Sequence, residues 1–315
     1  MIDPDAQAAV LMLLAESRLS EDDIKCRLEQ AVDPAYWASV APFLSVAGSQ
    51  GGAVREQASL PDKTLDEITC SLASDGYFQI APLLSGPDVA RMRQGIEALR
   101  QAGWPSAFAF VFDEFWQITR TPSLVRLLTR VLGSRFRQNA DVWCHYVPPM
   151  SDSSGWVPHV DGHNKPNRLS LWIPLSDATL DNGCMYVVPR HRLPPSLANP
   201  GPDASIGWRD VRAALQSATA LPATAGSVLG WHFDVMHWGS RSLRPSHPRI
   251  SMAVEFVGET VVVADSERPL MAGDGAPPGL RQRLYCVGKG ILMYEKFEAP
   301  LIRFRELARR LTDPD

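Results

Sequence analysis

The segment from Trp156 to Pro189 constrains the fold of this chain more than any other. It contains the triplet His159-Val160-Asp161, an apolar run, an Asn-Gly turn and a second apolar run. Side chains two residues apart point to the same side of a β-strand, but to nearly opposite sides of a helix. On a strand, His159 and Asp161 would therefore converge on one point, as two ligands of a metal ion must.

The surrounding sequence predicts a mainly β chain with flanking helices. Between residues 136 and 259, runs such as AGSVLGWHF and RISMAVEFVGE are bounded by Gly, Pro and Asn and show no helical periodicity. That pattern is typical of an antiparallel sandwich or barrel. Residues 193–220 are expected to form a long connection in the β region, of a length that often serves as a lid. Helices are expected over 64–76, 85–103, 122–132 and 304–311.

Residues 1–62 are predicted to form an N-terminal helical extension and linker, and residues 63–315 the main domain. Ser20 and Asp23 have the spacing of a capping box, and apolar residues then recur every four positions from Ile24 until Pro34. The Gly-, Ser- and Gln-rich stretch 46–62 is typical of a linker. Further on, five aromatic residues between Phe108 and Trp116 are expected to pack in the core.

Composition narrows the possible partners. The net charge of −4 argues against nucleic acid or an anionic membrane, because phosphate binding requires a basic surface. The five cysteines are scattered and form no C-x-x-C motif, which favours reduced thiols. No apolar run approaches the roughly 18 residues of a membrane span. We therefore expect a cytoplasmic protein that acts on a small molecule.

The triplet alone does not identify a metal site. Roughly 0.8 matches to His-x-(Asp/Glu) are expected by chance in a chain of this composition, and the chain contains two, at His159 and His232. An open iron site uses two histidines and one carboxylate. For the first triplet, His237 can supply the third ligand. For the second, the later histidine outside the same run is His247, two residues before Arg249 and too close to it for separate strands.

Arg249 strengthens the choice of His159, Asp161 and His237. It begins the last β run, twelve residues after His237. If these two strands pair, the guanidinium lies near the metal inside a barrel, where a carboxylate would match its planar fork. The iron hypothesis therefore rests on four residues in order, not on one triplet.

With these residues in place, the chain resembles the phytanoyl-CoA dioxygenase (PhyH-like) family of Fe(II)/2-oxoglutarate-dependent oxygenases. The resemblance spans roughly Thr64–Gly258 and rests on the His159 triplet and on LSLWIPLSDATLDNGCMYVVP, AGSVLGWHFDVMHWGS and PRISMAVEF. It implies a double-stranded β-helix (jelly-roll, cupin-like) core that holds Fe(II) through His159, Asp161 and His237. It also implies that Arg249 binds the cosubstrate 2-oxoglutarate, with help from Ser251 and a pocket wall formed by Trp172.

The activity implied by the resemblance is hydroxylation of an unactivated C–H bond, with consumption of O2 and release of succinate and CO2. The substrate would be a small metabolite or natural-product intermediate, free or attached to CoA or a carrier protein; desaturation and cyclisation are the other outcomes of this chemistry. The carboxylate at Asp161 favours hydroxylation, because halogenases of this group carry a small residue there.

Two positions depart from the family pattern. Pro189-Arg190-His191-Arg192 stands where the family often has Pro-Gly-Ser-His, and Val147-Pro148-Pro149 where it has Lys-Pro-Pro. Trp143 and His145 share a strand face with Val147 and are candidates to replace the missing lysine.

Other interpretations remain open at the level of sequence. A His/Asp/His zinc-dependent hydrolase would use the same ligands but leaves Arg249 unexplained, and a non-catalytic ligand-binding barrel leaves the open iron face unexplained. The polar residues just after the triplet either contact a polar substrate or form a solvated loop: His163, Asn164, Lys165 and Arg168.

Overall fold

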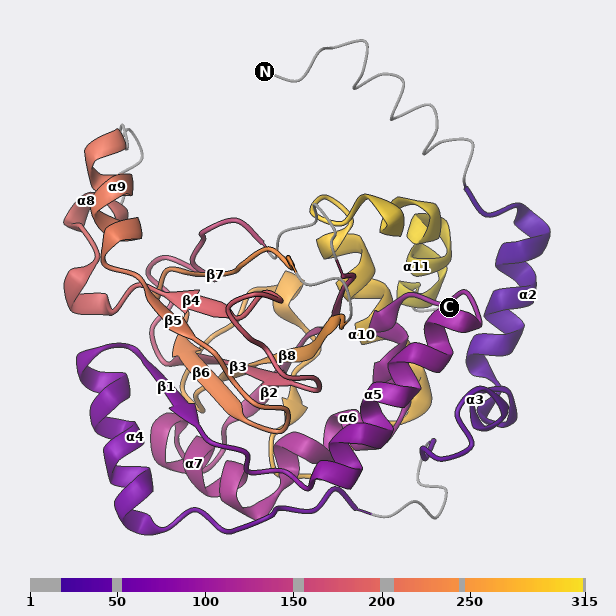
Figure 1. Ribbon diagram of the computed structural model, residues 1–315. Helices are drawn as coiled ribbons and strands as arrows, with labels where there is room; N and C mark the ends of the chain where they lie inside the picture. The colour runs from indigo at the N-terminus through magenta and orange to yellow at the C-terminus, as the bar shows by residue number, and fades with distance from the viewer. Residues whose placement is uncertain (1–17, 47–52, 150–155, 199–206, 244–246, 314–315) are drawn as a thin grey trace.

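Two antiparallel sheets form the centre of the molecule (Figure 1). The computed structural model describes residues 18–46, 53–149, 156–198, 207–243 and 247–313. A six-stranded sheet has the order β1-β6-β3-β8-β2-β9, and a three-stranded sheet has the order β5-β4-β7. The strands are β1 Tyr77–Ile80, β2 Arg137–Val147, β3 Arg168–Pro174, β4 Met185–Val187, β5 Thr219–Leu221, β6 Val228–His232, β7 His237–Gly239, β8 Arg249–Val257 and β9 Met271–Ala272.

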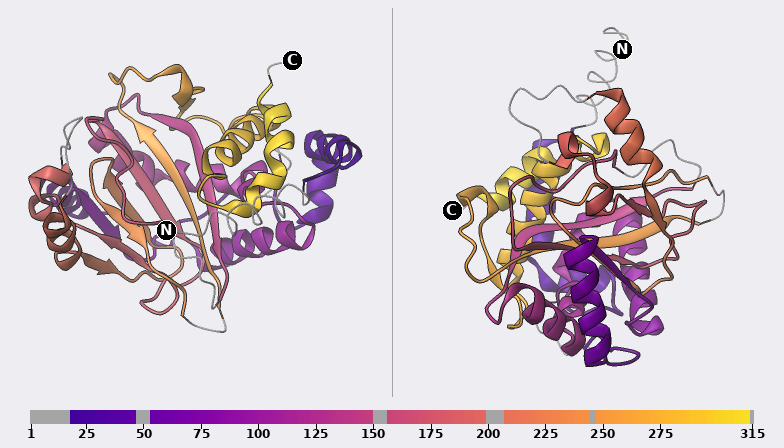
Figure 2. Two further views of the ribbon diagram at one scale, coloured as in Figure 1. Left: turned by 90° about the horizontal axis from the view of Figure 1, so that it is seen from above. Right: turned by 90° about the vertical axis from the view of Figure 1, so that its left-hand side faces the viewer.

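Helices cover the outer face of the larger sheet. The helices longer than one turn are α2 Glu21–Val32, α3 Pro34–Val40, α4 Asp62–Ser74, α5 Gly86–Gln101, α7 Pro122–Leu132, α9 Trp208–Gln216, α10 Leu280–Tyr294 and α11 Arg305–Thr312. Seen from two further directions, α10 and α11 lie on the same side of the sheets as α2, while α9 lies at the opposite end (Figure 2). None of the described helices combines the length and apolar character that a membrane crossing requires.

Successive side chains of the central strands point to opposite faces of the larger sheet, so two separate apolar layers form. On β8, Ile250, Met252 and Val254 face the helices and belong to the larger hydrophobic cluster. Trp172 of β3 and Leu229 of β6 belong to a second cluster, which also contains residues of β4 and lies between the sheets. This two-sheet arrangement is a mainly β, jelly-roll core with flanking helices, as predicted. The aromatic cluster between Phe108 and Trp116 is fully buried in the larger cluster, also as predicted.

The N-terminal helices pack against the rest of the chain. Ser20 and Asp23 form the predicted capping box at the start of α2. Trp37 of α3 is fully buried and stacks on Phe108, with ring centroids 5.7 Å apart. The predicted helix over residues 1–17 lies outside the described residues, and the division of the chain at residue 62 stays a prediction.

Two segments differ from the sequence-based expectation. The connection 193–220 contains helix α9 and the single turn α8 (Pro195–Ala198), so it is not an irregular loop. Helix α10 was not predicted, because Gly288 and Gly290 interrupt its pattern. A Cβ on Gly288 would lie 2.8 Å from the carbonyl oxygen of Ala308 in α11, and one on Gly290 3.0 Å from the carbonyl oxygen of Val142 in β2. These glycines therefore permit close packing of α10, although glycine inside a helix is unfavourable by intrinsic propensity.

Candidate active site

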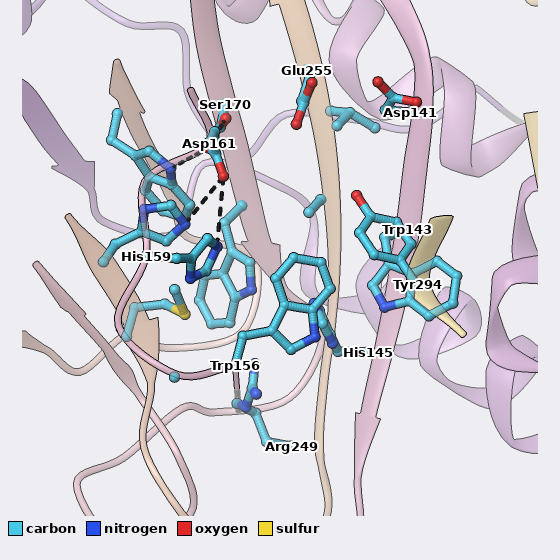
Figure 3. A pocket seen from close by; sticks show the side chains of 17 residues that line it. Asp141, Trp143, His145, Trp156, His159, Asp161, Ser170, Arg249, Glu255 and Tyr294 are labelled. Atoms are coloured by element: carbon cyan, nitrogen blue, oxygen red, sulfur yellow. Dashed lines mark hydrogen bonds and ion pairs between the residues drawn. The ribbon is translucent and has the colours of Figure 1, made fainter. Parts of the chain in front are cut away.

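One cavity between the two sheets gathers the polar residues that the sequence singled out (Figure 3). Its walls come mainly from side chains that alternate along three neighbouring strands. The residues are Asp141, Trp143 and His145 on β2, Ser170 and Trp172 on β3, and Arg249, Ala253 and Glu255 on β8. His159, Asp161 and His237 also line it. The fold therefore brings together residues that are more than a hundred positions apart in the chain.

His159, Asp161 and His237 present three ligand atoms that all lie within 4.8 Å of one another. Oδ1 of Asp161 lies 3.7 Å from Nε2 of His159 and 3.6 Å from Nε2 of His237. Among the described residues, this is the one group of three His, Cys, Asp or Glu side chains arranged in this way. Two imidazoles and one carboxylate match the donor set of an open non-haem iron site.

Backbone carbonyls orient both imidazoles. Nδ1 of His159 lies 2.8 Å from the carbonyl oxygen of Val157, and Nδ1 of His237 lies 3.0 Å from that of Val235. A carbonyl only accepts, so each Nδ1 carries the proton and each Nε2 keeps its lone pair. Burial lowers the pKa of His237 to about 4, with the Asp161 carboxylate opposing the shift. At neutral pH His237 is therefore uncharged, as a metal ligand must be.

The carboxylate of Asp161 is held by its other oxygen. Oδ2 accepts hydrogen bonds from Oγ of Ser170 at 2.5 Å and from Nε1 of Trp231 at 3.0 Å. These two contacts leave Oδ1 directed at the histidines. Such outer partners fix ligand geometry and are part of the design of most protein metal sites.

The prediction that the His159 triplet lies on a strand was wrong. His159 forms a single β-bridge with His237, through backbone hydrogen bonds of 3.1 and 2.9 Å, and Asp161 follows in a bend. The bridge joins the two histidines directly, so convergence of the ligands does not depend on a regular strand.

Arg249 is a buried guanidinium at one end of the cavity, with 1% of its surface exposed. Its Nη1 donates to Oγ of Ser251 at 3.2 Å, and its Nε has no hydrogen-bond partner. Within the described part of the chain, no ion pair joins Arg249 to a carboxylate. Burial accordingly lowers its pKa to about 10. A buried cation without a counter-charge is costly, so this end of the cavity suits an anionic ligand.

The strand pairing that places Arg249 near His237 differs from the pairing considered from sequence. Strand β8 pairs with β2 and β3, whereas β7, which begins with His237, pairs with β4 in the other sheet. Arg249 and His237 therefore approach across the interior of the barrel, not along one ladder. Both still line the same cavity.

The remaining predicted cosubstrate residues have distinct positions. Trp172 lines the cavity, and its ring lies 5.7 Å from Cζ of Arg249. Ser251 is fully buried and contacts Arg249 without lining the cavity. Trp143 and His145 line the cavity and Val147 does not, which keeps the first two as candidates to replace the missing family lysine.

Several polar residues considered from sequence lie outside the cavity. Asp234, the acid of the second triplet, pairs with Arg190 at 2.7 Å. His191 pairs with Asp75 at 3.0 Å. Arg168, considered as a substrate contact, is buried in an ion pair with Glu267. These groups serve local structure.

Sequence reasoning missed several residues of the cavity wall, among them Asp141, Trp156, Glu255 and Tyr294. Glu255 continues the alternation 249, 251, 253 along β8, so that pattern could have found it. Tyr294 ends helix α10, which was not predicted, so no signal pointed to it.

Comparison with known proteins agrees with this geometry. Two solved structures share the fold: a non-haem monooxygenase, ThoJ in complex with nickel, has a TM-score of 0.55 at 16% identity, over 74% of this chain and 99% of its own. The non-haem α-ketoglutarate-dependent carbocyclase SnoK from nogalamycin biosynthesis has a TM-score of 0.51 at 20% identity, over 66% of this chain and 87% of its own. The fold is that of the jelly-roll, non-haem oxygenases.

The sequence comparison identifies the family that this chain resembles. Residues 113–250 match the family described as phytanoyl-CoA dioxygenase (PhyH). The L-proline trans-4-hydroxylase of Streptomyces griseoviridis is 25% identical over 249 residues, which is 64% of this chain and 91% of that protein. The resemblance to the PhyH-like Fe(II)/2-oxoglutarate-dependent oxygenases predicted from the motifs is confirmed, and the family match covers residues 113–250.

Proposed function

We propose that this protein is an Fe(II)- and 2-oxoglutarate-dependent dioxygenase that hydroxylates an unactivated C–H bond of a small molecule. His159, Asp161 and His237 would hold the iron, since their free ligand atoms converge and their other atoms are already engaged. The iron and 2-oxoglutarate together supply the activation of O2, with succinate and CO2 as coproducts.

The observation that carries this proposal is the buried charge of Arg249. A zinc hydrolase with the same three ligands has no use for a guanidinium that lacks a carboxylate partner in the described chain. A dicarboxylate cosubstrate supplies that partner, and the fork of an arginine binds a carboxylate bidentately. Ser251, whose hydroxyl accepts a hydrogen bond from Nη1 of Arg249, would hold the guanidinium in position for that carboxylate.

The chain's own residues would then bind, orient and exclude water. Arg249 anchors 2-oxoglutarate at one end, and Trp172 forms a wall beside it. Trp156 contacts His159, with ring centroids 5.4 Å apart, and covers the triad from the side of α10. An apolar enclosure of this kind strengthens the electrostatic interactions inside it.

Hydroxylation of a small molecule is the outcome that the relatives support best. The curated relative hydroxylates L-proline, and the carboxylate at Asp161 fills the position that halogenases leave open. We therefore propose a small-molecule substrate, free or carrier-bound, for the domain 63–315.

Succinate formation tests this function directly. Purified protein supplied with Fe(II), 2-oxoglutarate and O2 is expected to form succinate, and a library of small metabolites is expected to contain compounds that raise the rate, since substrate binding couples the two half-reactions. Omission of either Fe(II) or O2 should stop succinate formation. Turnover of a library compound with Zn(II) and without 2-oxoglutarate would instead establish the hydrolase.

A further inference from the structure

The cavity has a second polar end that the metal and cosubstrate do not use. Asp141 of β2, Glu255 of β8 and Tyr294 of α10 line it, and these three residues are called the acidic end. In Figure 3 the two carboxylates lie together on the side of the cavity away from Arg249. Glu255 is opposite Ser170 in the register of β3 and β8, and Ser170 binds the iron ligand Asp161. The acidic end therefore adjoins the metal centre.

Tyr294 contributes a hydroxyl to the acidic end. Its side chain is 8% exposed, and its hydroxyl makes no hydrogen bond within the described residues. In Figure 3 that hydroxyl points toward the carboxylates of Glu255 and Asp141. Burial raises the pKa of Tyr294 well above its ordinary value, and both carboxylates raise it further. The hydroxyl opens onto the cavity, so it is available to a polar group of a ligand bound there.

The charges of the cavity point to the sign of that group. Asp141 is paired with Lys289 at 3.4 Å, whereas Glu255 accepts one hydrogen bond from Asn139 at 3.2 Å and forms no ion pair among the described residues. Bound Fe(II) and 2-oxoglutarate would carry equal and opposite charges. Asp161 and Arg249 likewise offset each other. Burial, with the Asp161 and Asp141 carboxylates, raises the pKa of Glu255 well above its ordinary value, so its ionised form lacks a compensating charge that a bound cation would supply.

We propose that the acidic end binds a protonated amine of the substrate, between the carboxylates of Glu255 and Asp141 and the hydroxyl of Tyr294. This inference rests on the proposed function, and it names the substrate class of that site as small molecules with a cationic nitrogen near the oxidised carbon. Trp143 and Trp156 line the same cavity and add aromatic faces, which attract cations.

Matched ligand pairs test the proposal without knowledge of the substrate. The probes are L-proline with cyclopentanecarboxylate, pipecolate with cyclohexanecarboxylate, and cyclopentylammonium with cyclopentanol. Each is titrated by calorimetry into protein loaded anaerobically with Fe(II) and 2-oxoglutarate. At least one amine is expected to bind about tenfold or more tightly than its amine-free partner, as hydrogen bonds to charged groups allow.

Two variants assign that preference to the acidic end. Glu255→Gln should abolish the preference for the amine over its amine-free partner, and Tyr294→Phe should reduce that preference by about two- to tenfold. Glu67→Gln makes the same chemical change at an exposed position on α4 and should keep the preference. The proposal is wrong if no amine binds better than its partner, or if Glu255→Gln retains the difference.

The proposed function has a separate readout in the same samples. An Fe(II)–2-oxoglutarate absorption band together with an absent amine preference would contradict the substrate class alone. Loss of the band with the amine preference intact would contradict the oxygenase assignment and leave the amine site in place.

Discussion

Replacement of Arg249 by alanine is expected to weaken 2-oxoglutarate binding by about 30-fold or more. The guanidinium is fully buried and would form a hydrogen-bonded charge pair with the cosubstrate, and truncation of one partner in such a pair costs about 2–5 kcal/mol. Calorimetric titration of 2-oxoglutarate into anaerobic, iron-loaded protein measures the change. Arg249→Lys keeps the charge but loses the planar fork, so its affinity should fall between those of the wild type and Arg249→Ala.

The same variant should behave differently in the absence of cosubstrate. Arg249 then has no carboxylate partner in the described chain, so Arg249→Ala removes an uncompensated charge from the interior. We expect its free energy of unfolding without 2-oxoglutarate to equal or exceed that of the wild type. The role given to Arg249 would be contradicted if Arg249→Ala bound 2-oxoglutarate as tightly as the wild type. It would also be contradicted if the variant lost the same free energy of unfolding with and without 2-oxoglutarate.

Replacement of Asp161 should have an equally large effect on iron. Asp161→Gly removes one of three ligands, and iron affinity is expected to fall by about 100-fold or more, since loss of even an outer partner of a metal site costs 10–100-fold. Metal content after anaerobic dialysis measures this loss, and succinate formation should disappear with it. Asp161→Asn retains an acceptor for Ser170 and Trp231, so it tests the ligand with less disturbance of the surrounding structure.

The second triplet provides the matched control for that experiment. Asp234 follows a histidine at the same spacing as Asp161, but it pairs with Arg190 outside the cavity. Asp234→Gly should therefore leave iron content and succinate formation near the wild-type values. Full activity of Asp161→Gly, or loss of iron from Asp234→Gly, would show that the wrong triplet was chosen.

The candidate iron site could be proposed from sequence because its residues are tied to local patterns. His159 and Asp161 are two residues apart, and His237 and Arg249 begin short β runs. The pairing of those runs could not be predicted, because a strand's partner is determined by packing across the whole barrel. The chosen residues do line one cavity, but the strand of Arg249 does not pair with that of His237 as the sequence argument supposed.

The substrate end of the cavity was less accessible to prediction. Tyr294 belongs to a helix whose two glycines hide its periodicity, although they allow the helix to pack closely against β2. Asp141 and Glu255 are ordinary acidic residues in the sequence, and only the alternation of two strands turns them inward. Their place in the cavity depends on contacts between elements more than a hundred residues apart in the chain.

The most direct test of the account is the absorption spectrum of the anaerobic protein with Fe(II) and 2-oxoglutarate. Bidentate binding of the cosubstrate to iron gives a weak visible charge-transfer band, which is expected in the wild type and in Asp234→Gly. In Arg249→Ala the band should require about 30-fold or more 2-oxoglutarate, and in His237→Ala it should be absent. A wild-type protein without the band, or variants of Arg249 and His237 with an unchanged band, would contradict the assignment of this cavity as an Fe(II)/2-oxoglutarate site.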